Sequence, residues 1–257
     1  MDPLLRQVAT ALDSIAETSV IWKKGLLNPG GPHRRLKGNL MPVSIGEDEC
    51  LVFGEVIRAL RPTQCFIIGN AFGFSAAYIA SVMRDNGGKR VVTLDSQSEG
   101  AGVRCAEIAQ KLLERLDLGT ILVNKKGWSP KDVPTAVEAP VHELVFIDGD
   151  HSHPQVTLDF DAVLPFIDDT SVVAFHDGWI RGIPEAVEHA RAKGFRCLWV
   201  PTSCEMILGT RDAAMFGRLQ ALFPRGVEEH APPSYARSYA IAARELFRFG
   251  WDQVRRR

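Results

Sequence analysis

Hydrophobic residues are grouped in two ways along this chain. From residue 64 onward, short apolar runs without strict polar alternation are separated by stretches with the three-and-four spacing of amphipathic helices. The runs occupy 65–68, 91–94, 121–123, 144–147, 171–175 and 197–200. Strands covered on both faces have this pattern, so we predict an α/β fold built on a doubly wound, Rossmann-like, mostly parallel sheet. A further run at 206–209 predicts an antiparallel edge strand.

Both ends of the chain are predicted to be helical. Apolar residues recur at every third or fourth position from Leu4 to Ile15 and predict a helix over 4–21. Glycine and proline then interrupt the pattern, so residues 29–41 are expected to form a loop and are a candidate lid. Ser44 and Glu47 have the spacing of a capping box, which predicts the start of the next helix there. A C-terminal helix is predicted over 235–254.

Charge and cysteine content exclude several classes of protein. The 257 residues include 30 Lys and Arg against 31 Asp and Glu, a formal net charge of −1, so we expect no nucleic-acid partner. No apolar run approaches the ~20 residues of a membrane-spanning helix, and Asp2 stands where a secretory signal would be basic. The five cysteines are odd in number and none has C-x-x-C spacing, which disfavours zinc and a disulfide framework. We therefore predict a cytoplasmic protein with no membrane partner.

Glycines and an acid follow the first two apolar runs, where open parallel sheets bind their ligands. Gly69 and Gly73 bracket the turn into the next helix, with G-x-x-x-G spacing in place of the dinucleotide-binding G-x-G-x-x-G. A packing turn is the alternative interpretation. Asp95 ends the second run, and an acid at this place accepts the hydroxyls of a ribose, although a solvated strand end is the alternative. Together these features favour a cofactor that contains a nucleoside.

Five ionisable residues follow the fourth and fifth runs. Asp148, Asp150 and His151 come after the fourth run, and His176 and Asp177 come after the fifth. If the two strands are neighbours, their ends lie about 5 Å apart. Asp148, His176 and Asp177 would then be able to bind one divalent cation. The alternative is a pair that caps a helix and hydrogen-bonds a loop.

These segments together resemble the class I S-adenosylmethionine-dependent methyltransferases. The resemblance is greatest to the metal-dependent O-methyltransferases of small molecules, covers residues 38–210, and has the Asp-Gly-Asp-His sequence at 148–151 as its most specific part. It implies that the methionine part of the cofactor is held by the glycine turn and that Asp95 holds the ribose. The adenine would be flanked by Trp128 and Ser129. The full set of implied cofactor-binding residues is Gly69, Asn70, Gly73, Phe74, Ser75, Asp95, Trp128, Ser129 and Asp148.

The resemblance also implies a metal site and a general base. The metal ligands would be Asp148, His176 and Asp177, and the base would be Asp150 or His151. We favour Asp150 for an aliphatic or sugar hydroxyl, whereas His151 suits a phenol or catechol equally well. A histidine at position 176, where a carboxylate is usual, shifts the expected ion from Mg²⁺ toward Mn²⁺, Fe²⁺ or Co²⁺.

One position departs from the family in the cofactor site. Members usually carry an acid two residues before the first glycine, and this chain has Ile67 there. The amino group of the cofactor must then find other partners.

The expected function is therefore O-methylation of a hydroxyl on a small acceptor, such as a sugar, polyketide or phenolic natural product. We expect an N-terminal helical cap and lid loop over 1–45, a cofactor-binding methyltransferase domain over 46–210 and a C-terminal helical extension over 211–257. The N- or C-terminal helices are expected to support a homo-oligomer. Two alternatives remain, an NAD(P)-dependent oxidoreductase and a non-catalytic binding protein on the same fold.

Overall fold

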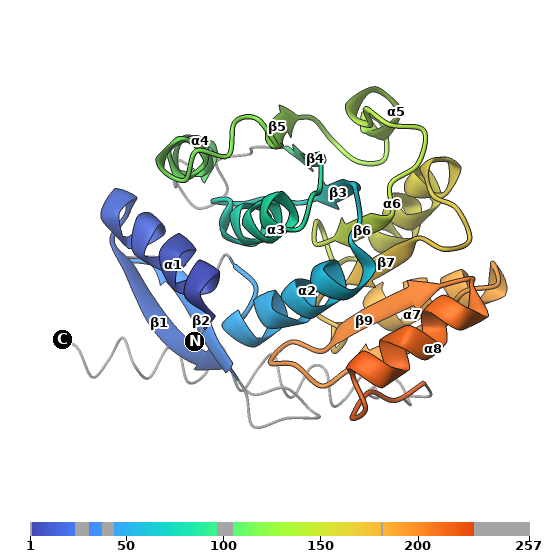
Figure 1. Cartoon of the computed structure of the whole chain (residues 1–257). Helices are drawn as coiled ribbons and strands as arrows, with labels where there is room; N and C mark the ends of the chain where they lie inside the picture. The colour runs from blue at the N-terminus through green and yellow to red at the C-terminus, as the bar shows by residue number, and fades with distance from the viewer. Residues whose placement is uncertain (1, 24–30, 38–43, 97–104, 181, 229–257) are drawn as a thin grey trace.

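A seven-stranded sheet forms the centre of the computed structural model, which describes residues 2–23, 31–37, 44–96, 105–180 and 182–228. Its strand order is β5-β4-β3-β6-β7-β9-β8 (Figure 1). The bounds are β3 (Gln64–Ile68), β4 (Arg90–Asp95), β5 (Leu122–Lys126), β6 (Leu144–Ile147), β7 (Val172–Phe175), β8 (Arg196–Val200) and β9 (Met206–Thr210). The strands from β5 to β7 pair in parallel, and the order reverses between β3 and β6. The predicted fold class is confirmed.

The antiparallel strand β9 lies one place in from the edge of the sheet. It pairs with β7 on one side and with β8, the edge strand, on the other. Because β9 is antiparallel to both, β8 runs in the same direction as β7. The short connection from β8 to β9, residues 201–205, therefore lies at the same edge of the sheet as the loops that follow the parallel strands.

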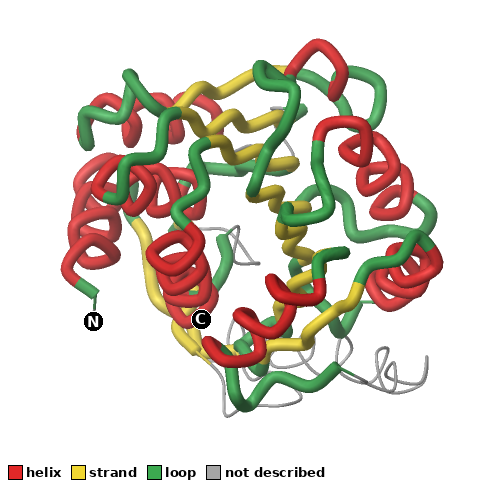
Figure 2. The backbone as a smooth tube through the Cα atoms, turned by 45° about the vertical axis from the view of Figure 1, so that its right-hand side comes forward, coloured by secondary structure: helices red, strands yellow, loops and turns green. Residues whose placement is uncertain are grey.

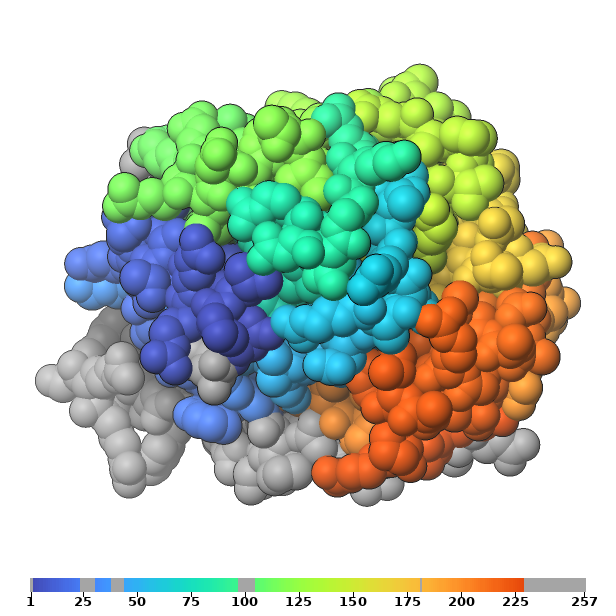
Figure 3. Space-filling model, in the orientation of Figure 1, coloured from blue at the N-terminus to red at the C-terminus, as the bar shows by residue number. Residues whose placement is uncertain are grey.

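Helices cover both faces of the sheet, and alternate strand residues point to opposite layers (Figure 2). One layer holds α2 (Glu47–Leu60), α3 (Phe74–Asp85), α4 (Cys105–Arg115) and α8 (Ala213–Leu222). The other holds α5 (Val133–Ala136), α6 (Gln155–Val163), the 3₁₀ turn η1 (Leu164–Phe166) and α7 (Gly182–Ala192). Helix α1 (Pro3–Ile15) packs on α3 and α4, and Figure 3 shows α1, α2, α3 and α8 side by side over this face.

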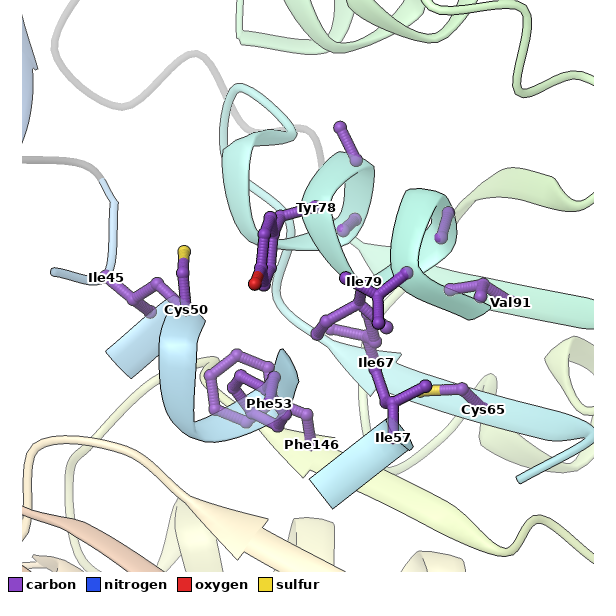
Figure 4. Packing of buried hydrophobic residues seen from close by; sticks show 14 of the residues in the cluster. Ile45, Cys50, Phe53, Ile57, Cys65, Ile67, Tyr78, Ile79, Val91 and Phe146 are labelled. Carbon is purple, nitrogen blue, oxygen red and sulfur yellow. The ribbon is translucent and has the colours of Figure 1, made fainter. Parts of the chain in front are cut away.

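Ile67 belongs to the hydrophobic core. Its side chain is fully buried under α2 and α3, beside Ile57 and Ile79 (Figure 4). The neighbouring residue Ile68 points to the other layer. Position 67 therefore supplies packing between the sheet and two helices, and an acid there would be buried in an apolar environment.

The N-terminal segment differs from the prediction. Helix α1 begins after Asp2, whose carboxylate accepts hydrogen bonds from the Leu4 and Leu5 amides at 2.8 and 3.2 Å, and it ends at Ile15. The predicted continuation to residue 21 and the predicted loop after it were wrong, because β1 (Thr18–Lys23) and β2 (Gly31–Leu36) pair as antiparallel strands. Residues 29–30 and 38–41 of the predicted lid and the predicted helix at 235–254 lie outside the described residues.

Helix α2 also begins differently from the prediction. Gly46 is its N-cap, and the amide of Gly46 donates to Glu49 Oε2 at 2.7 Å. The Ser44 hydroxyl donates instead to the Arg34 carbonyl oxygen at 3.1 Å, so the predicted pairing of Ser44 with Glu47 was wrong. The first turn of α2 thus directs the Glu49 carboxylate back toward the sheet edge.

Two observations bear on the class of protein. In the described ranges, no helix is both long enough and apolar enough to cross a membrane. All five cysteines lie in described segments and carry free thiols.

Candidate active site

A cavity of about 510 Å³ opens at the carboxyl ends of the parallel strands. It contains every predicted site residue except Gly73. The predicted residues that line it are Gly69, Asn70, Phe74, Ser75, Asp95, Trp128, Ser129, Asp148, Asp150, His151, His176 and Asp177. The topology therefore joins the predicted cofactor residues and the predicted metal and base residues in one space.

The glycine turn after β3 depends on a close approach between two loops. Gly69 has a φ of +89°, and a Cβ atom there would lie 2.1 Å from the carbonyl oxygen of Asp148. Only glycine permits both this φ and this approach. Gly73 has a φ of +85° and is the N-cap of α3, where it packs against Ala109 of α4. Gly73 thus shapes the turn without lining the cavity.

Asp95 holds the glycine turn from the neighbouring strand. Its Oδ2 accepts hydrogen bonds from the amides of Asn70 and Ala71, at 2.7 and 3.0 Å. The Asn70 side chain donates to Asn124 on the next strand at 3.1 Å. Asp95 is therefore a structural support for the turn as well as a cavity residue.

The segment after β5 forms a second wall of the cavity. The Trp128 amide donates to Asp132 Oδ2 at 2.8 Å, and the Ser129 carbonyl accepts from Gln155 Nε2 at 2.9 Å. Gln155 also donates to Asp159 at 2.6 Å. The backbone of this segment is held at both residues, while the Trp128 side chain is 62% exposed.

Two imidazoles and two carboxylates form a compact cluster at the other end of the cavity. His176 Nδ1 lies 2.8 Å from Asp148 Oδ1 and 3.5 Å from Asp177 Oδ2. His151 Nε2 lies 3.4 Å from Asp148 Oδ1, and its Nδ1 lies 3.2 Å from Asp177 Oδ2. The predicted convergence of the strand ends of β6 and β7 is thus present in the fold.

The carboxylates and imidazoles of this cluster shift one another's pKa values. Burial alone would favour neutral imidazoles, but Asp148 and Asp177 raise the pKa of His151 to about 9. Burial acts the same way on His176, and Glu49, Asp148 and Asp177 outweigh it, so the His176 pKa lies well above its usual value. Burial would raise the pKa values of Asp148 and Asp177, but the two histidines, chiefly His176, lower both. Without a cation, the cluster therefore holds protons on its imidazoles at neutral pH.

Asp177 has a strained backbone. Its φ is +55°, in the left-handed region that costs a non-glycine residue about 1–2 kcal/mol. The conformation is held by the Trp179 indole, which donates to Asp177 Oδ1 at 3.1 Å, and by the Gly178 amide, which donates to the Glu205 carbonyl at 2.9 Å. Strain of this kind is concentrated at functional sites, because the surrounding structure must maintain it.

Comparisons with known proteins agree with this site. Residues 66–178 match the family model described as a methyltransferase domain. The matched segment runs from β3 to the residue after Asp177, so it contains the glycine turn, Asp95 and the whole cluster of imidazoles and carboxylates.

Solved structures show that the similarity in fold extends beyond this matched segment. A putative O-methyltransferase from Klebsiella pneumoniae is 14% identical, with a TM-score of 0.60 over 83% of this chain and 91% of that one. An O-methyltransferase from Bacillus cereus in complex with SAH is 16% identical, with a TM-score of 0.59 over 82% and 91%. TomG from Streptomyces achromogenes, an O-methyltransferase of tomaymycin synthesis in complex with SAM, is 15% identical, with a TM-score of 0.57 over 82% and 90%. A comparison with curated proteins finds no match. The predicted resemblance to class I methyltransferases is confirmed.

Sequence reasoning missed Glu49, which lies behind the cluster of imidazoles and carboxylates. Glu49 is fully buried, and its Oε2 accepts from His176 Nε2 at 2.9 Å and from the Gly46 amide. Its Oε1 accepts from the Thr202 hydroxyl at 3.0 Å and the Cys204 amide at 3.2 Å. The run of three acids at 47–49 was the available signal, but only the docking of α2 on the 201–205 connection shows which acid is used.

Segments outside residues 66–178 complete the cavity wall. Lys23 at the end of β1 and Ser44 before α2 both line it. The hairpin is anchored here by His33 of β2, whose Nε2 lies 2.7 Å from the Ser203 hydroxyl. That hydroxyl lies 2.7 Å from Asp48 Oδ1. The N-terminal residues thus join the β8–β9 connection at the end of the cavity that holds the cluster.

Asp150 lies apart from the two acids of the cluster, Asp148 and Asp177. It is exposed at the rim of the cavity, and its Oδ1 accepts from the Ser152 amide at 2.9 Å. Asp148 and His151, on the same loop, belong to the buried cluster. The two predicted candidates for the base therefore occupy different environments, one open to solvent and one between carboxylates.

Proposed function

We propose that this protein is an S-adenosylmethionine-dependent O-methyltransferase that acts on a hydroxyl of a small molecule, with the help of a divalent metal ion. The observation that carries the proposal is the single cavity, which has a glycine turn and a strand-end acid at one end and a cluster of carboxylates and imidazoles at the other. When bound, S-adenosylmethionine supplies a methyl group that is already activated on a sulfonium, so the protein must chiefly align and deprotonate the acceptor.

The residues at the first end of the cavity fit the cofactor. Gly69 and Asn70 of the glycine turn line the cavity, and Asp95 lies at the end of β4, the place from which such folds bind a ribose. Trp128 and Ser129 are proposed to flank the adenine, and Phe74 and Ser75 to contact the methionine part. Because Ile67 is buried in the core, the cofactor's amino group is bound by residues other than position 67.

The residues at the other end fit a divalent cation. His176 Nδ1 and His151 Nε2 are buried, and both face Asp148 at ion-pair distance without hydrogen-bond geometry to any described residue. The sequence-based ligand set, Asp148, His176 and Asp177, is brought together within this cluster. When bound, the ion supplies a positive charge that lowers the pKa of the acceptor hydroxyl and fixes its position.

The proton of the acceptor is proposed to pass to Asp150. Its carboxylate is at the cavity rim, whereas both nitrogens of His151 face the carboxylates of Asp148 and Asp177. An exposed carboxylate is a sufficient base for a hydroxyl whose pKa has been lowered.

Other features support a small acceptor. The cavity volume of about 510 Å³ is in the range of small-molecule sites. TomG, which shares the fold, is an O-methyltransferase of tomaymycin synthesis, and this likeness supports a natural product as the acceptor. A cytoplasmic location, with free thiols at all five cysteines, and self-association through the terminal helices are part of the same proposal.

The proposal is tested by thermal unfolding of the protein with S-adenosylhomocysteine, NADH and NADPH. A ligand present at 100 times its dissociation constant adds about 2.7 kcal/mol to the free energy of unfolding, which is easily measured. We expect S-adenosylhomocysteine alone to raise Tm. A rise in Tm with NADH or NADPH in its place would establish the oxidoreductase alternative, and no rise with any of the three would favour a non-catalytic protein.

Methyl transfer itself is tested against a panel of hydroxylated natural products, with S-adenosylhomocysteine release as the signal. Asp150→Asn is expected to lower turnover by about 100-fold while leaving cofactor affinity unchanged. The matched variant Asp161→Asn, an acid on α6 that pairs with His189 far from the cavity lining, should behave like the wild type. Unchanged turnover in Asp150→Asn would transfer the role of base to His151.

A further inference from the structure

The two imidazoles of the cluster each present one nitrogen to the same oxygen. His176 Nδ1 lies 2.8 Å and His151 Nε2 lies 3.4 Å from Asp148 Oδ1. Both nitrogens are buried, and among the described residues each faces a carboxylate oxygen at ion-pair distance without hydrogen-bond geometry. Buried nitrogens normally have a hydrogen-bond partner, so a cation that binds both nitrogens and this carboxylate would satisfy all three groups.

The opposite nitrogens are both occupied by carboxylates. His176 Nε2 is hydrogen-bonded to Glu49 at 2.9 Å, and His151 Nδ1 lies 3.2 Å from Asp177 Oδ2. Glu49 is held by four hydrogen bonds, and the other oxygen of Asp177 accepts from the Trp179 indole. A carboxylate behind each imidazole orients the ring and its free nitrogen, which is the usual arrangement around a metal ion.

The distance from each imidazole nitrogen to the carboxylate oxygen suits a single ion. Two donors that each lie about 2.1 Å from an ion are about 3.0 Å apart at a right angle and about 3.4 Å apart at a tetrahedral angle. The measured separations from Asp148 Oδ1 are 2.8 and 3.4 Å, and the three donor atoms all lie within 4.8 Å of one another.

We propose that a divalent transition-metal ion binds to Asp148 Oδ1, His151 Nε2 and His176 Nδ1. Glu49 and Asp177 orient the two imidazoles and are positioning residues. This ligand set differs from the one expected from the sequence, because His151 replaces Asp177. The inference deepens the proposed function, on which it rests for the role of the ion.

The proposed ligand set has two consequences. Two imidazoles and one carboxylate bind Fe²⁺, Co²⁺ or Zn²⁺ in preference to Mg²⁺, which favours oxygen ligands. Both nitrogens of His151 are also committed, one to the ion and one to Asp177, so His151 has no nitrogen left to accept a proton from the acceptor. The base is then Asp150.

The first test counts the imidazoles around the ion in the unaltered protein. Metal-free full-length protein is loaded with MnCl₂ and studied by pulsed electron paramagnetic resonance, in which each bound imidazole nitrogen contributes a characteristic modulation. We expect two imidazoles in the wild type and one in His151→Ala. One imidazole in the wild type, or no bound Mn²⁺, would overturn the proposal.

The second test measures affinity for CoCl₂ and MgCl₂ by titration. His151→Ala is expected to lower the Co²⁺ affinity by at least about tenfold, and Glu49→Gln and Asp177→Asn by about 10–100-fold while both imidazoles remain bound. His153→Gln and Glu47→Gln are matched controls, since His153 pairs with Glu185 on α7 and Glu47 with Arg34. Unchanged Co²⁺ affinity in His151→Ala, or a wild type that binds Mg²⁺ more tightly than Co²⁺, would restore the set with Asp177.

Cofactor binding in the same samples separates this inference from the proposed function. Binding of S-adenosylhomocysteine without any binding of Co²⁺ would refute the metal site and leave the methyltransferase intact. Binding of Co²⁺ at two imidazoles without binding of S-adenosylhomocysteine would support the metal site and refute the proposed function.

Discussion

Replacing Gly69 with alanine would test how the two ends of the cavity are joined. The new Cβ would lie 2.1 Å from the Asp148 carbonyl oxygen, so the loops after β3 and β6 would have to separate by about 1 Å to reach the closest contacts that real Cβ atoms make. A left-handed φ costs alanine about 1–2 kcal/mol, and the forced backbone shift adds about 1–3 kcal/mol. Gly69→Ala is therefore expected to lower the free energy of unfolding by about 2–5 kcal/mol.

Gly87 provides the control for this substitution. Its φ of +84° is close to the +89° of Gly69, but a Cβ atom there would have no neighbour within 4 Å in the part of the chain that the structure describes. Gly87→Ala should therefore show the conformational cost alone, about 1–2 kcal/mol. Urea unfolding of both variants measures this difference, and calorimetric titration with S-adenosylhomocysteine and CoCl₂ measures its effect on the cavity. We expect affinity for both ligands to fall at least about tenfold in Gly69→Ala, equivalent to 1.4 kcal/mol, and to be unchanged in Gly87→Ala.

Equal losses of stability in the two variants would refute this reasoning. They would mean that the φ angle alone requires glycine at position 69, and that the loop carrying Asp148 adjusts without cost. Wild-type affinity for both ligands in Gly69→Ala would lead to the same conclusion by an independent route.

Three further predictions concern other parts of the protein. Asp95→Ala should lower the free energy of unfolding by about 1–3 kcal/mol in urea, because two amides of the glycine turn lose their acceptor, and Asp95→Asn should lose less. Hydrogen bonds from Arg90 and Lys125 lower the pKa of Glu138 from 4.5 to about 2. The contribution of Glu138 to the free energy of unfolding, about 1 kcal/mol after solvent screening, is therefore present above pH 4.5 and is lost as the pH falls through 2. Glu138→Gln should be less stable than the wild type at pH 7, and the difference should disappear as the pH falls through 2. EDTA should lower the Tm of protein loaded with Co²⁺, and an unchanged Tm would contradict a metal held by the folded state.

The strand ends were predictable from sequence for a clear reason. Buried parallel strands are short and apolar, so the first polar residues after each run mark the edge where ligands bind. Asp95, Asp148 and His176 were all found in this way, and all line the cavity. That the strands before Asp148 and His176 are neighbours was a condition of the prediction, and the pairing of β6 with β7 meets it.

The residues that were missed depend on contacts between distant segments. Glu49 lies on a helix whose position relative to β7 is set by docking, so its pairing with His176 leaves no local signal. The hairpin was misjudged because Pro32 and the glycines around it resemble a loop. An antiparallel pair of edge strands tolerates proline, and Pro32 pairs with Trp22 within that hairpin.

Several contacts at this end of the cavity join residues that are far apart in the sequence, and this has a consequence for how the protein folds. His33 and Ser203 are 170 residues apart, Asp48 and Ser203 are 155 apart, and Glu49 and His176 are 127 apart. Contacts between residues so far apart in the sequence form late, because the entropy of closing the intervening loops must be overcome first. Any folding intermediate in which β8 and β9 have not joined the sheet therefore lacks the hydrogen bonds that hold Glu49 behind His176. The colour of bound Co²⁺ would then be a kinetic probe for the final step of folding, independent of the secondary structure that forms earlier.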